Sequence, residues 1–159
     1  MRLPKYAKLI LAIVACQAAG FVGSLFTSPQ ISTWYAGLAR PSFAPPNWLF
    51  APVWTTLFLL MGIAWYLIWQ KAAESRRARW AAGLFSVHLA FNTAWSVIFF
   101  GLRQPGWAFL EIIALLIMIA TLTVWFWRLD RRAGLLMIPY LLWVSFASVL
   151  NLAIWRLNA

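Results

Sequence analysis

The chain has 159 residues, of which 64% are hydrophobic and only 10% are charged, and its formal net charge is +10. Soluble domains carry about 25% charged residues, so this composition excludes an ordinary soluble protein. The single cysteine excludes a disulfide framework and a CxxC metal or redox site.

Apolar runs long enough to cross a bilayer, which takes about 20 residues each, follow one another along the chain. We identify five of them, at 9–26, 51–69, 80–101, 107–127 and 133–155. The alternating segments of about ten residues that mark a membrane barrel do not occur. The sequence therefore predicts an all-α integral membrane bundle of five transmembrane helices, forming a single transmembrane domain over 1–159.

The first run has two interpretations. The letters "IVAC" at 13–16 follow a basic start and resemble a bacterial lipoprotein cleavage box, whose apolar region is about 7–15 residues long. The run continues through "QAAGFVGSLF", however, which gives it the length of a full span. We therefore expect Cys16 to lie inside a membrane helix, with lipidation of Cys16 as the alternative.

The segment at 27–50 predicts a lid loop. Loops longer than about 12–15 residues are usually functional or disordered, and this one is too aromatic for disorder. Ser28 as N-cap and Pro29 at the first helical position predict a short helix that ends before Pro41. The prolines that follow stiffen the rest of the loop. Arg40 is expected to meet the carboxylates of an anionic ligand here.

The third run separates into two helical faces. A polar face, about 200° from the other, is expected to point into the bundle and contains His88, Asn92 and Ser96. Small residues that recur every four positions favour close helix contact, either within the chain or at a homodimer interface, and these are Ala82, Ser86, Ala90 and Ala94.

Three polar residues inside the runs need an explanation. We expect His88 to be a hydrogen-bonded core residue, with haem ligation as the alternative. Glu111 is expected to be protonated or to reach the interface, with the bundle interior as the alternative. Asn151 is expected to bond a neighbouring helix. One histidine and three acidic residues indicate no metal cluster and no hydrolytic site.

The basic residues predict the topology. One side of the membrane carries ten of them: Arg2, Lys5, Lys8, Lys71, Arg76, Arg77, Arg79, Arg128, Arg131 and Arg132. The opposite side carries three: Arg40, Arg103 and Arg156. Cytoplasmic loops carry the excess of Lys and Arg, so we expect a cytoplasmic N-terminus. The charge then serves topology and contact with anionic membrane lipids rather than binding of nucleic acid.

The twelve tryptophans fall into two main groups. Indoles at span ends anchor to the headgroup layer, and this group contains Trp69, Trp80, Trp125, Trp127 and Trp155. Trp54, Trp95 and Trp143 lie deeper, on helical faces that also carry polar or small residues. Aromatic stripes that meet polar groups beneath an aromatic lid suit a large flat ligand.

Three segments, "WYAGLARPSFAPPNWLFAPVW", "FNTAWSVIFFG" and "IPYLLWVSFASVLNLAIWRLN", closely resemble the TspO/MBR family of tryptophan-rich sensory proteins and translocator proteins, once called the peripheral-type benzodiazepine receptor. The resemblance extends from "FVGSLF" in the first run to "WRLN" near the C-terminus. It implies a five-helix, often dimeric bundle that binds porphyrins, sterols and drug-like molecules beneath the first loop. It implies no required cofactor, with porphyrin or haem as a ligand.

Carried over by position, the resemblance implies a pocket lined by Trp34, Pro45, Pro46, Trp48, Leu49, Trp54, Asn92, Trp95, Trp107, Trp143, Ala147 and Leu150. Trp54 and Trp143 match two tryptophans implicated in light-dependent porphyrin breakdown in some bacterial members, which makes them the candidate catalytic residues. Leu152 stands where animal members have the tyrosine of their sterol-recognition pattern, so a specific sterol role is not predicted.

Together these features predict a membrane receptor or sensor for porphyrins and other hydrophobic ligands, with a role in tetrapyrrole transport or turnover. The alternatives are a light- and oxygen-dependent porphyrin-degrading enzyme and a transporter of porphyrins or sterol-like lipids. We expect a homodimer in a bacterial membrane. The charge bias favours the inner membrane, and the outer membrane is the alternative because some relatives occupy it.

Overall fold

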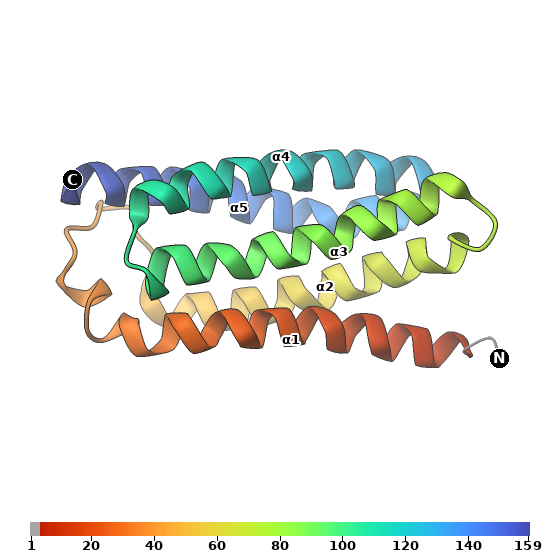
Figure 1. Cartoon of the computed structure of the whole chain (residues 1–159), viewed down its shortest axis with the longest axis horizontal. Helices are drawn as coiled ribbons and strands as arrows, with labels where there is room; N and C mark the ends of the chain where they lie inside the picture. Colours follow the sequence, from red (N-terminus) through yellow and green to blue (C-terminus); the bar gives the residue numbers. More distant parts are fainter. Residues whose placement is uncertain (1–3) are drawn as a thin grey trace.

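A computed structural model describes residues 4–159, and within them each predicted span is a helix. The helices α1 (Lys5–Ile31), α2 (Phe50–Lys71), α3 (Arg76–Ser96), α4 (Pro105–Leu129) and α5 (Arg131–Asn158) alternate in direction along one axis (Figure 1). All five are long and apolar enough to cross a bilayer in this part of the chain, as predicted. The protein is therefore an integral membrane protein.

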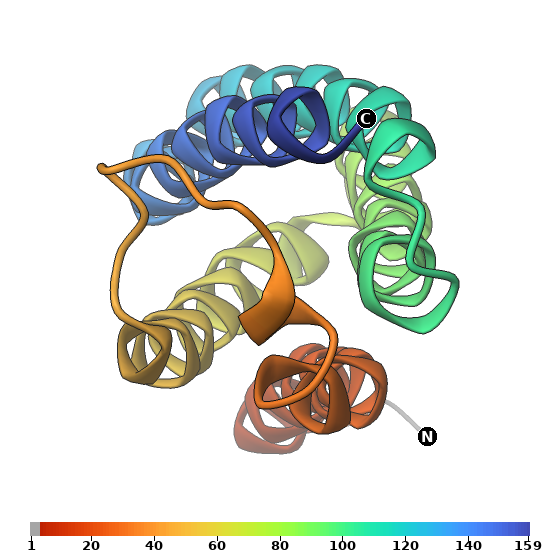
Figure 2. The ribbon, with the colours of Figure 1, turned by 90° about the vertical axis from the view of Figure 1, so that its left-hand side faces the viewer.

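The helices form a closed ring when the bundle is viewed along its axis (Figure 2). Neighbours around the ring are α1, α2, α5, α4 and α3, and α3 packs against α1 to complete it. The α1–α2 connection, the α3–α4 turn and the end of α5 lie at one end of the bundle (Figure 1). The α2–α3 and α4–α5 turns lie at the other end, which is the basic one. Arg2 of the basic set falls outside the described residues.

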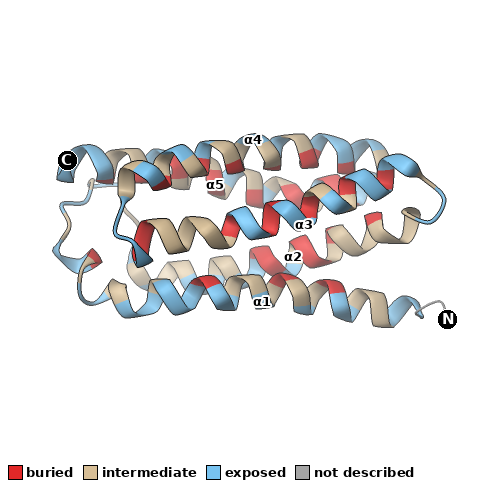
Figure 3. Ribbon diagram, in the orientation of Figure 1, coloured by how far each residue is buried: buried red, intermediate tan, exposed pale blue. Residues whose placement is uncertain are grey.

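The core follows the inward faces of the helices, where buried residues gather (Figure 3). Cys16 is fully buried inside α1, as expected for a membrane helix. Helices α1 and α2 are in close contact at two glycines: a Cβ added to Gly62 would lie 2.7 Å from Ile13 Cα, and one added to Gly20 would overlap the Phe58 ring. Small residues permit this close contact because they let two backbones meet.

The connection between α1 and α2 differs from the prediction. Pro29 does not begin a second helix, because α1 continues through it to Ile31. Hydrogen bonds inside a helix satisfy the backbone groups at membrane depth, which favours continuing α1. At its end, Thr33 N bonds Gln30 O, and Thr33 Oγ1 donates to Pro29 O at 2.8 Å in place of that amide.

The predicted lid loop at 27–50 is therefore shortened to residues 32–49. The predicted helix within it is reduced to a three-residue 3-10 helix, η1 (Tyr35–Gly37). A second 3-10 helix, η2 (Asn47–Leu49), leads directly into α2.

A π-helical turn, η3 (Val97–Gly101), follows α3. Leu102 N donates to Val97 O at 2.8 Å, one residue further back than in an α-helix. Phe99 and Phe100 are both buried in this turn, and both rings contact Trp34 and Tyr35 of the α1–α2 connection. Through these ring contacts, the π turn holds the connection against the end of the bundle.

At the basic end, Asp130 joins two turns. Its carboxylate lies 3.1 Å from Lys71 Nζ of α2 and 3.3 Å from Arg132 Nε of α5. It also caps α5 by accepting a hydrogen bond from Arg132 N. Lys71 Nζ in turn donates to Leu129 O at the end of α4. Asp130 therefore fastens α2 to the α4–α5 turn.

Candidate ligand-binding site

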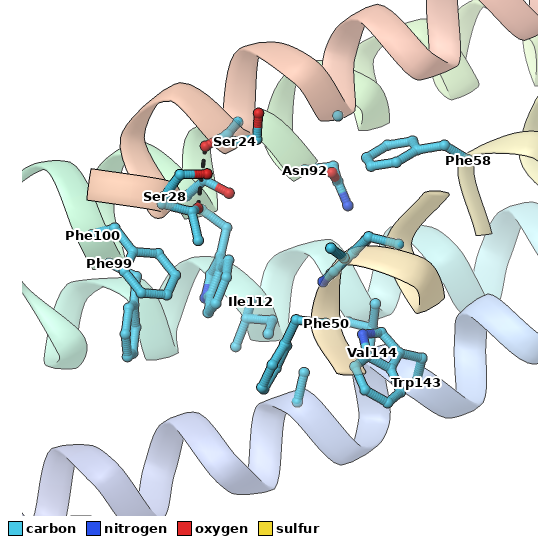
Figure 4. A pocket seen from close by; sticks show the side chains of 18 of the residues that line it. Ser24, Ser28, Phe50, Phe58, Asn92, Phe99, Phe100, Ile112, Trp143 and Val144 are labelled. Carbon is cyan, nitrogen blue, oxygen red and sulfur yellow. Dashed lines mark hydrogen bonds between the residues drawn. The ribbon is translucent and has the colours of Figure 1, made fainter. Parts of the chain in front are cut away.

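A cavity of about 510 Å³ lies inside the bundle, toward the end that carries the α1–α2 connection. All the helices contribute to its lining (Figure 4), and the connection adds Tyr35 and Asn47. Pockets for small molecules typically measure roughly 300–1,000 Å³ and combine apolar walls with a few polar groups. This cavity has that size and that composition.

One wall of the cavity is aromatic. It brings together Trp54 of α2, Trp95 of α3 and Trp143 of α5. Phe50 meets Trp143 edge-on, with ring centroids 5.9 Å apart, and Phe58 lies 5.5 Å from Trp54. The Trp143 indole nitrogen is buried and has no hydrogen-bond partner among the described residues. A flat ring against this wall would meet large apolar faces.

The opposite wall is more polar and is formed by α1. Gln17, Ser24 and Ser28 line the cavity there at helical spacing. Figure 4 shows Ser24 and Ser28 on the α1 side of the cavity, across from Phe50 and Trp143. Ser24 Oγ donates to Phe21 O at 2.7 Å, which leaves its oxygen able to accept a hydrogen bond. The two walls thus offer different chemistry to the two sides of a ligand.

A buried hydrogen-bond network joins α3 to α5 beside the cavity, at the lining residue Asn92. Tyr140 OH lies 2.8 Å from His88 Nε2 and accepts from Asn92 Nδ2 at 2.9 Å. His88 Nδ1 lies 3.1 Å from Phe85 O. Because a carbonyl only accepts, Nδ1 carries the hydrogen and Nε2 accepts from the Tyr140 hydroxyl. Both nitrogens of His88 are thus engaged, which confirms the expected core histidine and leaves neither for haem.

Two further polar side chains orient the aromatic wall. Asn151 Oδ1 accepts from Trp95 Nε1 at 3.0 Å, and Asn151 Nδ2 donates to Pro105 O at 2.8 Å. Asn151 therefore bonds two neighbouring helices, as predicted. Glu111 does not line the cavity: both its carboxyl oxygens are buried and have no hydrogen-bond partner in residues 4–159.

The predicted site residues divide between the cavity and its surroundings. Those that line the cavity are Trp54, Asn92, Trp95, Trp143, Ala147 and Leu150. Those that do not line it are Trp34, Arg40, Pro45, Pro46, Trp48, Leu49 and Trp107. Among the second group, Trp48 is 71% exposed and Trp107 is 67% exposed. A role in ligand contact for this second group stays a prediction.

Arg40 finds its partners inside the connection. Its Nη1 donates to Asn47 Oδ1 at 3.2 Å, and its guanidinium lies 5.5 Å from the centre of the Tyr35 ring. Arg40 therefore braces the connection rather than pointing into the cavity.

Sequence reasoning missed the contribution of α1. Gln17, Gly20, Ser24 and Ser28 all line the cavity, at spacings of three or four residues. This is a stripe of polar and small residues on an otherwise apolar span, which is the same signal that identified the polar face of the third run. It was available from the sequence.

The small-residue stripe on α3 faces away from the bundle at its centre. Ser86 and Ala90 are exposed, while Ala82 and Ala94 are half-buried. Packing within the chain therefore does not account for the middle of the stripe. The homodimer stays a prediction.

The fold and the site define a class: integral membrane proteins whose helices enclose an aromatic-lined cavity beneath a long first connection. Comparison with known proteins gives the family. The TspO/MBR family profile matches residues 12–156, and the chain belongs to this family.

Relatives match along nearly the whole chain. The tryptophan-rich protein TspO of Archaeoglobus fulgidus is 44% identical over 154 residues, covering 96% of this chain and 97% of the relative. The human translocator protein is 41% identical over 139 residues, covering 87% and 82%. The tryptophan-rich sensory protein of Cereibacter sphaeroides is 33% identical over 154 residues, covering 96% and 92%.

Proposed function

We propose that the protein is a membrane receptor or sensor that binds porphyrins and other flat hydrophobic molecules in the cavity. The observation that carries the proposal is the aromatic wall of Trp54, Trp95 and Trp143 around a cavity of about 510 Å³. Tetrapyrroles are flat, apolar on both faces and polar at their carboxylate edge. Indole faces stack favourably on such rings, and polar side chains fix their orientation.

Membership of a family whose members include a sensory protein and translocator proteins supports a role in sensing or moving the ligand. We also propose a cytoplasmic N-terminus, because the basic residues gather at the end of the bundle where α1 begins. A bacterial inner membrane fits this charge bias.

Tryptophan fluorescence tests the proposal. Protoporphyrin added to the purified protein is expected to quench the fluorescence saturably. Trp143→Phe is expected to weaken binding by about threefold to tenfold, because the smaller ring loses stacking area. The matched control is Trp80→Phe, since Trp80 is 64% exposed and lies outside the cavity. Absence of saturable quenching would contradict the proposal, and equal effects of the two substitutions would place the site elsewhere.

A second candidate function is light- and oxygen-dependent breakdown of the bound porphyrin. It is favoured by Trp54 and Trp143 lying in one cavity, because indoles held against a photo-excited porphyrin are readily oxidised. Illuminating the complex and following porphyrin absorbance tests it, with a dark sample as the control. Bleaching should slow strongly when both tryptophans are replaced by phenylalanine, and an unchanged rate would reject this candidate.

A further inference from the structure

We propose that ligands reach the cavity sideways from the bilayer, through an opening between α1 and α2, so that its natural ligands are molecules dissolved in the membrane. This inference rests on the proposed function. It concerns the route and the physical state of the ligand, which the size of the cavity and its aromatic wall leave open.

The first observation is where the cavity lining is uncovered. Five lining residues are exposed: Phe21, Ser24 and Ser28 on α1, and Ala51 and Thr55 on α2. The lining residues from α3, η3, α4 and α5 are all buried or half-buried. We call the five exposed residues the lateral mouth. Inside a membrane span, the surface of a helix that the protein does not cover faces lipid.

The second observation is where the glycine contacts between α1 and α2 lie relative to the lateral mouth. Deeper in the bundle they touch through Gly62 against Ile13 and Gly20 against Phe58. The lateral mouth lies on the connection side of these contacts. There, Gln17 Nε2 donates to Thr55 O at 3.0 Å and bridges the two helices across the inner edge of the mouth.

The chemistry of the mouth suits an amphipathic molecule. Three of its five side chains carry hydroxyls where lipid contact alone would favour aliphatic residues. The Thr55 hydroxyl donates to Ala51 O at 2.9 Å, and the Ser24 hydroxyl donates to Phe21 O. Each hydroxyl oxygen can still accept a hydrogen bond from outside. A flat hydrophobic molecule with a polar edge can therefore pass while its edge stays hydrogen-bonded.

The third observation is that the path through the end of the bundle is closed by fastened side chains. Asn158 holds Ala39 by two hydrogen bonds, and Arg40 is held by Tyr35 and Asn47. Tyr35 itself is buried against Phe99 and Phe100. The connection is thus attached to α5 and to η3, whereas the lateral mouth is bridged by Gln17 alone among the described side chains.

The experiment compares binding rates in lipid vesicles that contain the full-length protein, with protoporphyrin as the probe and tryptophan quenching as the signal. Thr55→Phe narrows the lateral mouth. Thr121→Phe is the matched control, because Thr121 is half-buried on a membrane helix outside the cavity and its hydroxyl donates to the carbonyl of Ile117, four residues earlier, at the same 2.9 Å. Asn158→Ala loosens the end of the bundle instead.

Thr55→Phe is expected to slow both association and dissociation by about tenfold or more, within the range that single substitutions reach. Thr121→Phe and Asn158→Ala should both bind as fast as the unmodified protein. Ser24→Phe, on the other side of the mouth, should repeat the effect of Thr55→Phe.

Two results would overturn the lateral route while leaving the proposed function intact: saturable binding at an unchanged rate in both mouth variants, or faster binding in Asn158→Ala. A loss of affinity in the mouth variants without slower association would also overturn it, because the new rings would then be occupying the site itself. Failure of the unmodified protein to bind protoporphyrin would instead reject the proposed function, and the lateral route with it.

Discussion

Asn158 and Ala39 lie 119 residues apart and exchange two hydrogen bonds: Ala39 N donates to Asn158 Oδ1 and Asn158 Nδ2 donates to Ala39 O, both at 2.9 Å. The side-chain amide thus pairs with both polar groups of one residue, as a neighbouring strand would. It anchors the α1–α2 connection to the last turn of α5.

Asn158→Ala should therefore loosen the connection without unfolding the bundle. Each hydrogen bond contributes about 0.5–1.5 kcal/mol net, so exchange of the Ala39 amide should accelerate by roughly tenfold to a hundredfold. Hydrogen exchange followed by mass spectrometry on peptides from the connection measures this. Peptides from α4 serve as the internal control. Unchanged exchange at Ala39 would show that other contacts hold the connection.

Tyr140→Phe should destabilise the bundle, because it removes the hydroxyl on which both His88 and Asn92 depend. Leaving a buried polar group unsatisfied costs about 1–3 kcal/mol, and this substitution affects two. Thermal unfolding in detergent measures the loss as a lower Tm. Tyr66→Phe is the matched control, since Tyr66 is half-buried on α2 and lies outside this network. A Tm equal to that of the control would contradict the assigned network.

Gly62→Ala should weaken the packing of α1 on α2. The added Cβ would lie 2.7 Å from Ile13 Cα, and a backbone atom moves only with its helix. Overpacking of this kind costs about 1–3 kcal/mol. Gly83→Ala is the control: nothing lies within 4 Å of its added Cβ, so alanine there should be neutral or stabilise α3 by up to about 1 kcal/mol. Equal stabilities for the two variants would contradict the close contact.

The ion pairs of Asp130 predict a dependence of stability on pH. Burial by itself raises the pKa of this carboxyl, but the hydrogen bonds of Arg132 and Lys71 outweigh it and hold the pKa at about 2. A carboxyl whose pKa is lower in the folded state stabilises the fold above its unfolded pKa of about 4 and loses that contribution as the pH falls toward the folded value. Stability should therefore decline between about pH 4 and pH 2.

Asp130→Asn isolates this contribution, because asparagine does not titrate. Unfolding measured across the acid range should show a shallower decline for this variant than for the unmodified protein. Glu74→Gln is the control, since Glu74 is the other acidic residue outside the spans and is exposed. If Glu74→Gln removed the decline and Asp130→Asn preserved it, the pH dependence would come from Glu74 in the α2–α3 turn. That result would contradict the role assigned to Asp130.

The spans and the interior face of the third helix were predictable because both depend on local periodicity. Apolar runs of membrane length must be helical to satisfy their backbone hydrogen bonds, so their secondary structure follows from the sequence. His88 and Asn92 recur at helical spacing on one side of the third run, and both are buried.

Two elements were not predictable from local pattern. Pro29 signalled the start of a helix, but α1 continues through it to Ile31, because a helix satisfies its backbone groups internally at membrane depth. The π turn at Val97–Gly101 also has no recognisable sequence signal, because it depends on how Phe99 and Phe100 pack against the connection. Arg40 contacts Tyr35 and Asn47, and these contacts could not be predicted without the path of the connection.

The lateral mouth also means that the protein alone does not enclose its own cavity. Acyl chains beside Phe21 and Thr55 supply the remaining wall, so the bilayer becomes part of the binding site. Affinity should then vary with chain length, unsaturation and headgroup, and a value obtained in detergent micelles belongs to protein and detergent together. In two cells with different membrane lipids, the same protein would bind its ligand with different affinity.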